Sequence, residues 1–379
     1  MSHPMRRALL PLLLLLLTGC AHQRGAVHSG GATADGPRGP RTRVALGDTR
    51  IQSDIDALLG TASYDAQDLF QYGLDALDRE EPTLARVAFT RVIAEFPASP
   101  LSAPARYNLA LAAERQGMTL DAARFYGEYA DVTEGTDAAD AAHSRFHQGR
   151  LLFEADAFAE AYLPLQRALR ADALDLPASW EARIYSARIS GKSGQWRVAE
   201  GELSSIRRTI RRTTRTTGER FPWHSAMVWF HAGELYRDRA EAQTLLDVDD
   251  LFAARRWLDD TAMWFLEARR CYKRVLEHRL VEWSGPSGLA LGRINEDFRA
   301  TMLAADTPTA LDADATAVYL DLLQEQTNAF LEKAIEDYRW LLRDARTLRI
   351  EGPWVEELRM ALRRVEGQLD RPGSATVAR

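Results

Sequence analysis

The sequence predicts an all-α protein, a right-handed α-solenoid built from pairs of helices, and three observations carry this prediction. From about residue 53 onward Leu, Ala, Arg and Glu dominate and runs of β-branched residues are missing, which is a composition typical of helices. Small residues recur at a constant interval, as they do in repeat proteins. Apolar side chains in the long segments fall on single helical stripes.

Residues 53–213 are predicted to form four helix pairs. In each pair a small residue is followed 12 positions later by an alanine, and a bulky residue comes four positions after that alanine. Small side chains at these points allow two antiparallel helices to cross closely. The four pairs of small residues are Gly73 with Ala85, Ala110 with Ala122, Gly149 with Ala161, and Ala187 with Ala199.

The first pair shows the motif most fully. It contains Leu69-x2-Tyr72-Gly73-x2-Ala76, then Ala85-x3-Phe89, then a closing Pro97. This pattern resembles the tetratricopeptide repeat, although successive repeats here are 37 to 39 residues apart and the simplest repeats have about 34. The resemblance implies a concave groove, lined by the first helix of each pair, that binds partner proteins.

The repeat register selects ten candidate groove residues. They precede the small crossing residue by one turn or follow it directly. Aromatic anchors with two arginines suit a peptide that carries an acidic group, and the alternative is that these side chains pack against the preceding repeat. The candidates are Phe70, Leu74, Tyr107, Leu111, Phe146, Arg150, Ile184, Arg188, Phe230 and Glu234.

Residues 214–283 are predicted to form a fifth, interrupted repeat. Gly233 marks its first helix, but Ala268-x3-Tyr272 follows 35 residues later, so an insertion lies at about 238–260. Asp249 or Asp250 would cap a long, Trp-rich second helix. One stripe of that helix carries Trp257, Trp264, Ala268, Cys271 and Val275.

The C-terminal part, residues 284–370, is predicted to contain a loop, a long helix and a capping helix. Gly285-Pro286, Gly288, Gly292 and Thr307-Pro308 predict a loop over 284–313. The long helix then carries Ala334-x3-Tyr338 as a degenerate sixth repeat and ends before Gly352-Pro353. An amphipathic helix over 354–369 would cap the solenoid, and residues 371–379 are expected to be disordered.

The start of the chain predicts export. The apolar run of residues 8–17 is too short to span a bilayer, which takes about 20 residues, and it follows Arg6 and Arg7 as in a secretory signal. Leu17-Thr18-Gly19-Cys20 resembles the lipobox of bacterial lipoproteins. That resemblance implies removal of residues 1–19 and a covalent lipid on Cys20; the alternative is an ordinary signal peptide with a chance cysteine.

The two residues after Cys20 bear on which membrane would anchor the protein. Ala21 and His22 stand where lipoproteins kept in the inner membrane carry Asp, so the resemblance implies the periplasmic face of the outer membrane. Residues 20–52 are rich in Gly, Ala, Arg and Pro and predict a flexible tether. About 30 residues of that composition would hold the folded part roughly 30 Å from the membrane.

A second resemblance concerns the envelope machinery. Phe96-Pro97-x-Ser99, followed by a repeat that opens with Ala105-x-Tyr107-Asn108-Leu109-Ala110, is similar to outer-membrane β-barrel assembly lipoproteins and to Tol-associated periplasmic repeat proteins. It implies a scaffold for envelope proteins, in barrel assembly, secretion, pilus formation or motility. The likeness covers about 110 residues and leaves the last 150 outside it.

A basic stripe offers a second function. Arg207, Arg208, Arg211, Arg212 and Arg215 share one helix face and would suit peptidoglycan or lipopolysaccharide. The alternative is a solvated helix end, where cations complement the helix dipole.

Other functions receive little support. The formal charge is −6, and it becomes −8 on loss of the two arginines in residues 1–19, which argues against nucleic-acid binding. G-x-S-x-G, H-E-x-x-H and a Gly-rich phosphate loop are missing from the sequence, so no enzyme, metal or cofactor is expected. His224, His231 and Glu234 are too few for a metal site.

Overall fold

The computed structural model describes residues 64–245, 248–309, 311–347 and 349–369. Those residues form α-helices joined by short turns, and they contain no strand. The expected signal at 1–19, the Cys20 tether and the 371–379 tail lie outside the described residues. The helices are α3 (Ala66–Asp78), α4 (Pro82–Glu95), α5 (Ser102–Arg115), α6 (Thr119–Thr133), α7 (Ala138–Glu154), α8 (Phe158–Arg170), α9 (Leu176–Lys192), α10 (Trp196–Thr217), α11 (Pro222–Glu241), α12 (Leu251–Leu276), α13 (Val281–Leu303), α14 (Ala313–Thr347) and α15 (Pro353–Leu369).

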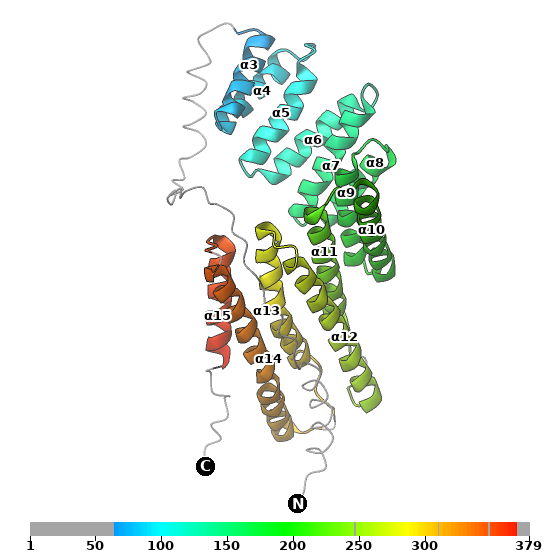
Figure 1. Ribbon diagram of the computed structural model, residues 1–379, viewed down its shortest axis with the longest axis vertical. Coiled ribbons are helices and arrows are strands. Elements are labelled where there is room, and N and C mark those ends of the chain that lie inside the picture. Colours follow the sequence, from blue (N-terminus) through cyan, green and yellow to red (C-terminus); the bar gives the residue numbers. More distant parts are fainter. Residues whose placement is uncertain (1–63, 246–247, 310, 348, 370–379) are drawn as a thin grey trace, which may run out of the picture.

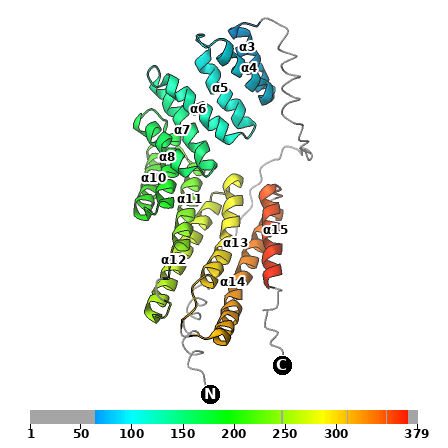
Figure 2. The same ribbon diagram turned by 180° about the vertical axis from the view of Figure 1, so that it is seen from behind.

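The helices stack as a solenoid. Each helix packs against the next one in the chain, and α9, α11, α13 and α15 also contact one another in series. Figures 1 and 2 show the row running from α3 at one end to the long helices α12–α14 and the final helix α15 at the other. The prediction of an all-α solenoid of tetratricopeptide-like helix pairs is confirmed.

Small residues set the close helix crossings. Gly73 of α3 lies against Phe89 of α4, and Gly149 of α7 lies against Leu165 of α8; an added Cβ would come within 2.6 Å and 2.5 Å of those side chains. Phe89 and Leu165 are fully buried. Ala110 and Ala187, which replace glycine in the other pairs, are also buried, with 0% and 3% of their surface exposed.

The fifth pair keeps this crossing despite its insertion. The insertion lengthens the helices around the crossing: α11 has 20 residues and α12 has 26. Asp250 caps α12, and its side chain accepts hydrogen bonds from the backbone of Phe252 and Ala253. Gly233 still lies against Tyr272, where an added Cβ would come within 2.5 Å of the ring.

The predicted loop over 284–313 is wrong for most of its length, because α13 occupies residues 281–303. Its glycines are crossing positions: Gly285 lies under Trp354, and Gly292 lies under Tyr338. The pattern that suggested a turn therefore reflects the close approach of α14 and α15. Pro286 lies near the start of α13 and is exposed, so its missing N–H removes a single helical hydrogen bond.

Candidate functional site

The repeat register placed the ten groove candidates on the first helices of their pairs, but three of them are buried. Phe146 is 6% exposed, Ile184 is 0% exposed and Arg188 is 4% exposed. They belong to the core between neighbouring repeats, as the packing alternative expected. Side chains at this depth do not reach a partner that binds on the surface.

The charged groove candidates connect neighbouring helices. Arg150 of α7 donates to Glu114 of α5 at 2.5 Å and to Glu154 at 2.9 Å. Burial is the largest single effect and opposes the charge on Arg150, but the hydrogen bonds and negative charges of Glu114 and Glu154 together outweigh it and raise the guanidinium pKa. Glu234 of α11 accepts a 2.5 Å hydrogen bond from the hydroxyl of Tyr272 on α12. These contacts stabilise the stacking of the repeats.

A buried ion pair joins the fourth and fifth repeats. Arg188 of α9 lies 2.9 Å from a carboxylate oxygen of Asp238 on α11, and Lys192 donates to the other oxygen at 2.9 Å. The side chains of Arg188 and Asp238 are 5% and 7% exposed.

Phe230, the remaining aromatic candidate of this region, packs against Trp283 with ring centroids 5.4 Å apart.

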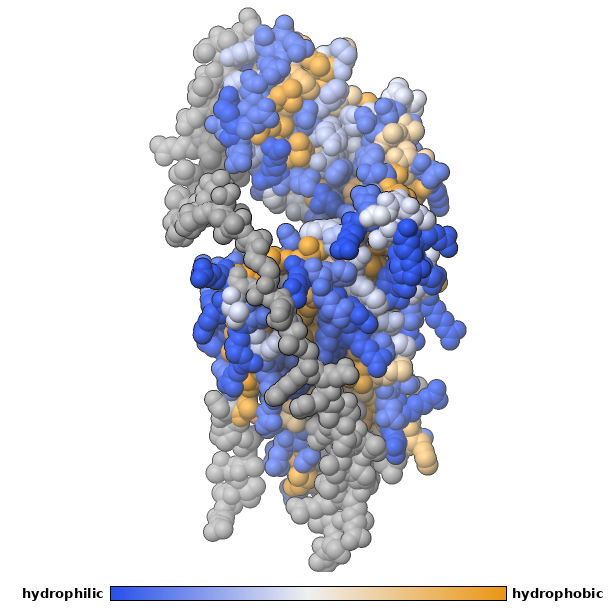
Figure 3. Space-filling view, in the orientation of Figure 1, coloured by the Kyte–Doolittle hydropathy of each residue, from blue (hydrophilic) through white to orange (hydrophobic). Residues whose placement is uncertain are grey.

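Four candidates of the first two repeats keep part of their surface in solvent. Phe70, Leu74, Tyr107 and Leu111 are all half-buried. Phe70 meets the ring of Phe89 edge-on at 5.6 Å, and Tyr107 meets Tyr126 in the same way at 5.5 Å. The space-filling view shows hydrophobic side chains between hydrophilic ones over α3–α5 (Figure 3). We call Phe70, Leu74, Tyr107 and Leu111 the N-terminal face.

The basic stripe lies on the solvent side of α10, whose opposite face buries Leu203, Ile206 and Ile210. Arg208, Arg211, Arg212 and Arg215 are exposed. Within the ranges that the structure describes, no carboxylate lies at ion-pair distance from these four arginines. Only Arg215 lies in the last turn of α10, so the helix dipole does not account for the whole stripe.

Arg207 differs from the rest of the stripe because it is held in place. Its guanidinium lies 4.1 Å from the ring centroid of Trp229 on α11, a cation–π geometry. It also donates to the hydroxyl of Ser204 at 3.0 Å. The side chain is therefore fixed between α10 and α11.

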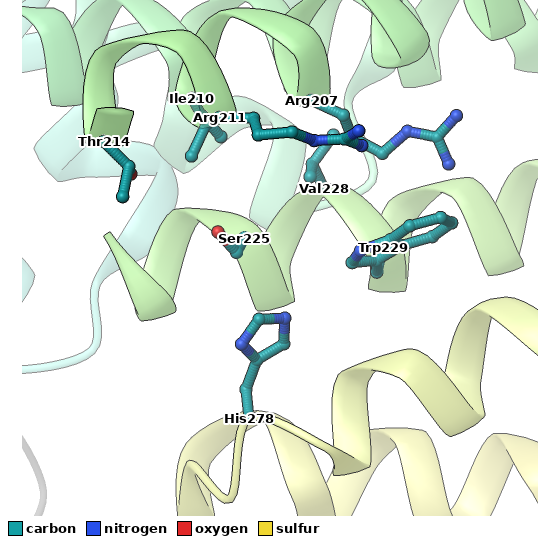
Figure 4. A pocket seen from close by; sticks show the side chains of 8 residues that line it. All are labelled: Arg207, Ile210, Arg211, Thr214, Ser225, Val228, Trp229 and His278. Carbon is teal, nitrogen blue, oxygen red and sulfur yellow. The ribbon is translucent and has the colours of Figure 1, made fainter. Parts of the chain in front are cut away.

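A cavity of about 220 Å³ lies beside this arginine. Figure 4 shows the α10 side chains on one side of the cavity and the α11 side chains on the other, with the His278 imidazole pointing in from the end of α12. Burial lowers the pKa of His278. The cavity is lined by Arg207, Ile210, Arg211, Thr214, Ser225, Val228, Trp229 and His278. We call it the α10–α11 pocket.

An open depression of about 360 Å³ adjoins the pocket along α10 and is lined by Arg208, Arg211, Arg212, Arg215 and Thr216. Arg211 lines both sites. The sequence predicted the arginines as candidate ligands for an anion, but it did not predict that Ser225 and His278 line the same site. Trp229 had a signal, since five of the nine tryptophans lie between Trp223 and Trp283, whereas His278 had none.

His224 and His231 contact other groups and do not form a metal site. His224 lies 3.1 Å from a carboxylate oxygen of Glu181. Burial, with a contribution from Arg188, lowers the pKa of His231 to about 3. Among the residues that the structure describes, no group of three or more His, Cys, Asp or Glu side chains is placed to hold a metal ion. No helix in the same ranges is both long and apolar enough to cross a membrane.

The helix packing defines the class of the chain, an α-solenoid of tetratricopeptide-like helix pairs. No family model matches the sequence, and no curated protein matches it. The solved structures similar to it include a tetratricopeptide repeat protein from Parabacteroides merdae, at 15% identity and a TM-score of 0.42 over 79% of this chain and 98% of that one.

Two further structures are more distant. A repeat protein of the same kind from Bacteroides fragilis has 12% identity and a TM-score of 0.31, over 60% of this chain and 98% of that one. A circular tandem repeat protein has 15% identity and a TM-score of 0.19, over 85% of this chain and 80% of that one.

Proposed function

We propose that the protein is a non-catalytic scaffold that binds envelope proteins at the periplasmic face of the outer membrane, where a lipid on Cys20 anchors it. The observation that supports this most directly is the N-terminal face. Stacked helix pairs leave the half-buried side chains of Phe70, Leu74, Tyr107 and Leu111 accessible on consecutive repeats. Aromatic and aliphatic side chains on a preformed helical surface suit an extended or helical segment of a partner.

The binding surface is tested with a charge placed on it. Leu74→Glu and Leu111→Glu should each abolish co-purification of partners from crosslinked cells, since a carboxylate at an apolar contact must be desolvated. Leu163→Glu is the matched control, because Leu163 lies on the second helix of its pair and is 52% exposed. Circular dichroism confirms that each variant is folded. Equal partner recovery in all three variants would overturn the proposed surface.

The anchor is tested separately. Cys20→Ala should move the protein from the membrane fraction to the soluble fraction, because the thiol that takes the lipid is lost. A Cys271→Ala variant is the control, since Cys271 is buried in the solenoid. Retention of Cys20→Ala in the membrane fraction would contradict the lipid anchor.

The basic stripe supports a second candidate function, which is binding of an anionic envelope polymer such as lipopolysaccharide or peptidoglycan. The specific observation is that Arg208, Arg211, Arg212 and Arg215 are exposed without carboxylate neighbours in the described chain. A triple Arg208→Ala, Arg212→Ala, Arg215→Ala variant should lose co-sedimentation with lipopolysaccharide, and salt should weaken the binding of the unmodified protein. Unchanged co-sedimentation of the triple variant would exclude the basic stripe as the binding site for lipopolysaccharide.

A further inference from the structure

We propose that the α10–α11 pocket is a binding site for a phosphomonoester, with Arg207 and Arg211 as the two guanidinium ligands. The ligand would be either a free phosphorylated metabolite or a lipid headgroup that ends in a phosphate. The proposal is independent of the scaffold function. It shares two stripe arginines with the second candidate function: Arg207, which lines the pocket alone, and Arg211, which lines both the pocket and the open depression.

The arrangement of donors favours a phosphate. Arg207 and Arg211 line one side of the pocket, and the hydroxyl of Ser225 and the imidazole of His278 line the other. Guanidinium groups bind phosphate oxygens through pairs of parallel N–H···O bonds. A carboxylate has two oxygens in one plane, whereas a terminal phosphate presents three oxygens in different directions. Donors that come from separate helices on opposite sides match the tetrahedral group better.

Arg207 is preorganised for this role. The Trp229 ring lies 4.1 Å below its guanidinium, and the Ser204 hydroxyl accepts one of its N–H groups. An arginine that is already fixed loses less side-chain entropy when a ligand binds. Its nearest fixed contacts are an aromatic ring and a hydroxyl, both neutral, so its charge is left for an anion.

Arg211 contributes the second charge and an entrance. It is exposed, it lies one turn after Arg207 on α10, and it lines the open depression as well as the pocket. A phosphate in the pocket would therefore be reached from the stripe side of α10. The remainder of the ligand would leave over Arg208, Arg212 and Arg215, which line the depression.

Calorimetric titration tests the proposal on the full chain in a Cys20→Ala background, which removes the lipid anchor from the measurement. The soluble probe is glycerol 3-phosphate. Arg211→Ala and Arg207→Lys should each weaken its binding by about tenfold or more, because each removes charge-assisted hydrogen bonds. Arg197→Ala is the matched control, since Arg197 is an exposed arginine of the same helix outside both sites.

A second arm distinguishes the two sources. Phosphatidylcholine vesicles that contain phosphatidate present a phosphomonoester headgroup, and vesicles that contain phosphatidylglycerol present only a diester. Tighter binding to phosphatidate vesicles than to glycerol 3-phosphate identifies a lipid headgroup, and the reverse identifies a soluble ligand. Both outcomes support the pocket if Arg211→Ala and Arg207→Lys each weaken the binding.

Three results would overturn the proposal. They are absence of binding to both phosphomonoester probes, an equal loss of binding in the Arg197→Ala control, and tighter binding of a glutamate-rich peptide than of either phosphate probe. The triple variant at Arg208, Arg212 and Arg215 distinguishes failure of the pocket proposal from failure of the proposed polymer binding. It leaves both guanidinium ligands of the pocket in place and should still bind glycerol 3-phosphate.

Discussion

Gly233 of α11 and Tyr272 of α12 lie in direct contact, so that a Cβ on the glycine would come within 2.5 Å of the tyrosine ring. Tyr272 is fully buried, and its hydroxyl donates to Glu234 at 2.5 Å, so the ring has little freedom to move. Gly233→Ala should lower the free energy of unfolding by about 1–3 kcal/mol through overpacking. Urea denaturation followed by circular dichroism measures the effect.

Gly201 provides the control for this prediction. It lies within α10, is exposed, and has open space where a Cβ would be placed. Gly201→Ala should therefore stabilise the protein by about 0.5–1 kcal/mol, because alanine is the better helix former. Stabilisation of similar size in both variants would show that the crossing at Gly233 does not require glycine.

The ion pair of Arg188 and Asp238 should be essential for the junction between the fourth and fifth repeats. Asp238→Ala leaves the Arg188 guanidinium, which is 5% exposed, without its carboxylate. Loss of one partner from a buried pair costs about 3–5 kcal/mol, so this variant should unfold at a clearly lower urea concentration than the unmodified protein.

The exposed pair of Lys333 and Glu336 is the control, since its side chains are 43% and 68% exposed. Glu336→Ala should change stability by less than about 0.5 kcal/mol. The expected role of Asp238 is contradicted if both variants lose the same small amount.

Acid should destabilise the protein through His231. Burial lowers its pKa in the folded chain from 6.5 to about 3, so below the unfolded-state pKa only the unfolded chain takes up the proton. Stability is therefore lost as the pH falls from about 6.5 toward 3, at up to about 1.4 kcal/mol per pH unit from this one residue. Urea midpoints measured across that range test the prediction.

His231→Gln separates this residue from other acid-sensitive groups. The variant lacks the titrating imidazole, so its stability should depend less steeply on pH between 6.5 and 3 than that of the unmodified protein. Parallel curves for the two proteins would show that His231 does not drive the acid sensitivity.

Cys271 should be unreactive while the protein is folded. Burial raises the pKa of its thiol to about 12, and the thiolate is the form that reacts. In a Cys20→Ala background, labelling by a thiol reagent should be slow in buffer and fast in urea. Equally fast labelling in both conditions would contradict the burial of α12.

The helices were largely predictable from the sequence because their signal is local. The 12-residue interval between Gly73 and Ala85 places two helices and their crossing at once, and the same holds for the next three pairs. The prediction of a loop at Gly285 to Gly292 was wrong for an identifiable reason. Glycine marks both turns and close crossings, and the bulky partners that distinguish them, Tyr338 and Trp354, lie about 45 to 70 positions away in the chain.

The candidate site was less predictable, because the burial of each side chain depends on the neighbouring repeats. The register placed Arg188 on the first helix of its pair, but its burial comes from Asp238 and the rest of α11. The α10–α11 pocket shows the same limit. Its walls come from α10, α11 and the turn after α12, and His278 enters it only because the chain turns there.

The central claim is that the N-terminal face binds a protein partner in the cell. A photoreactive amino acid at position 111 tests it most directly, with position 163 as the matched control on the second helix of its pair. The scaffold function predicts one discrete crosslinked species from position 111 on irradiation of intact cells, and its absence from position 163. The same crosslinked species from both positions, or none from position 111, would contradict it.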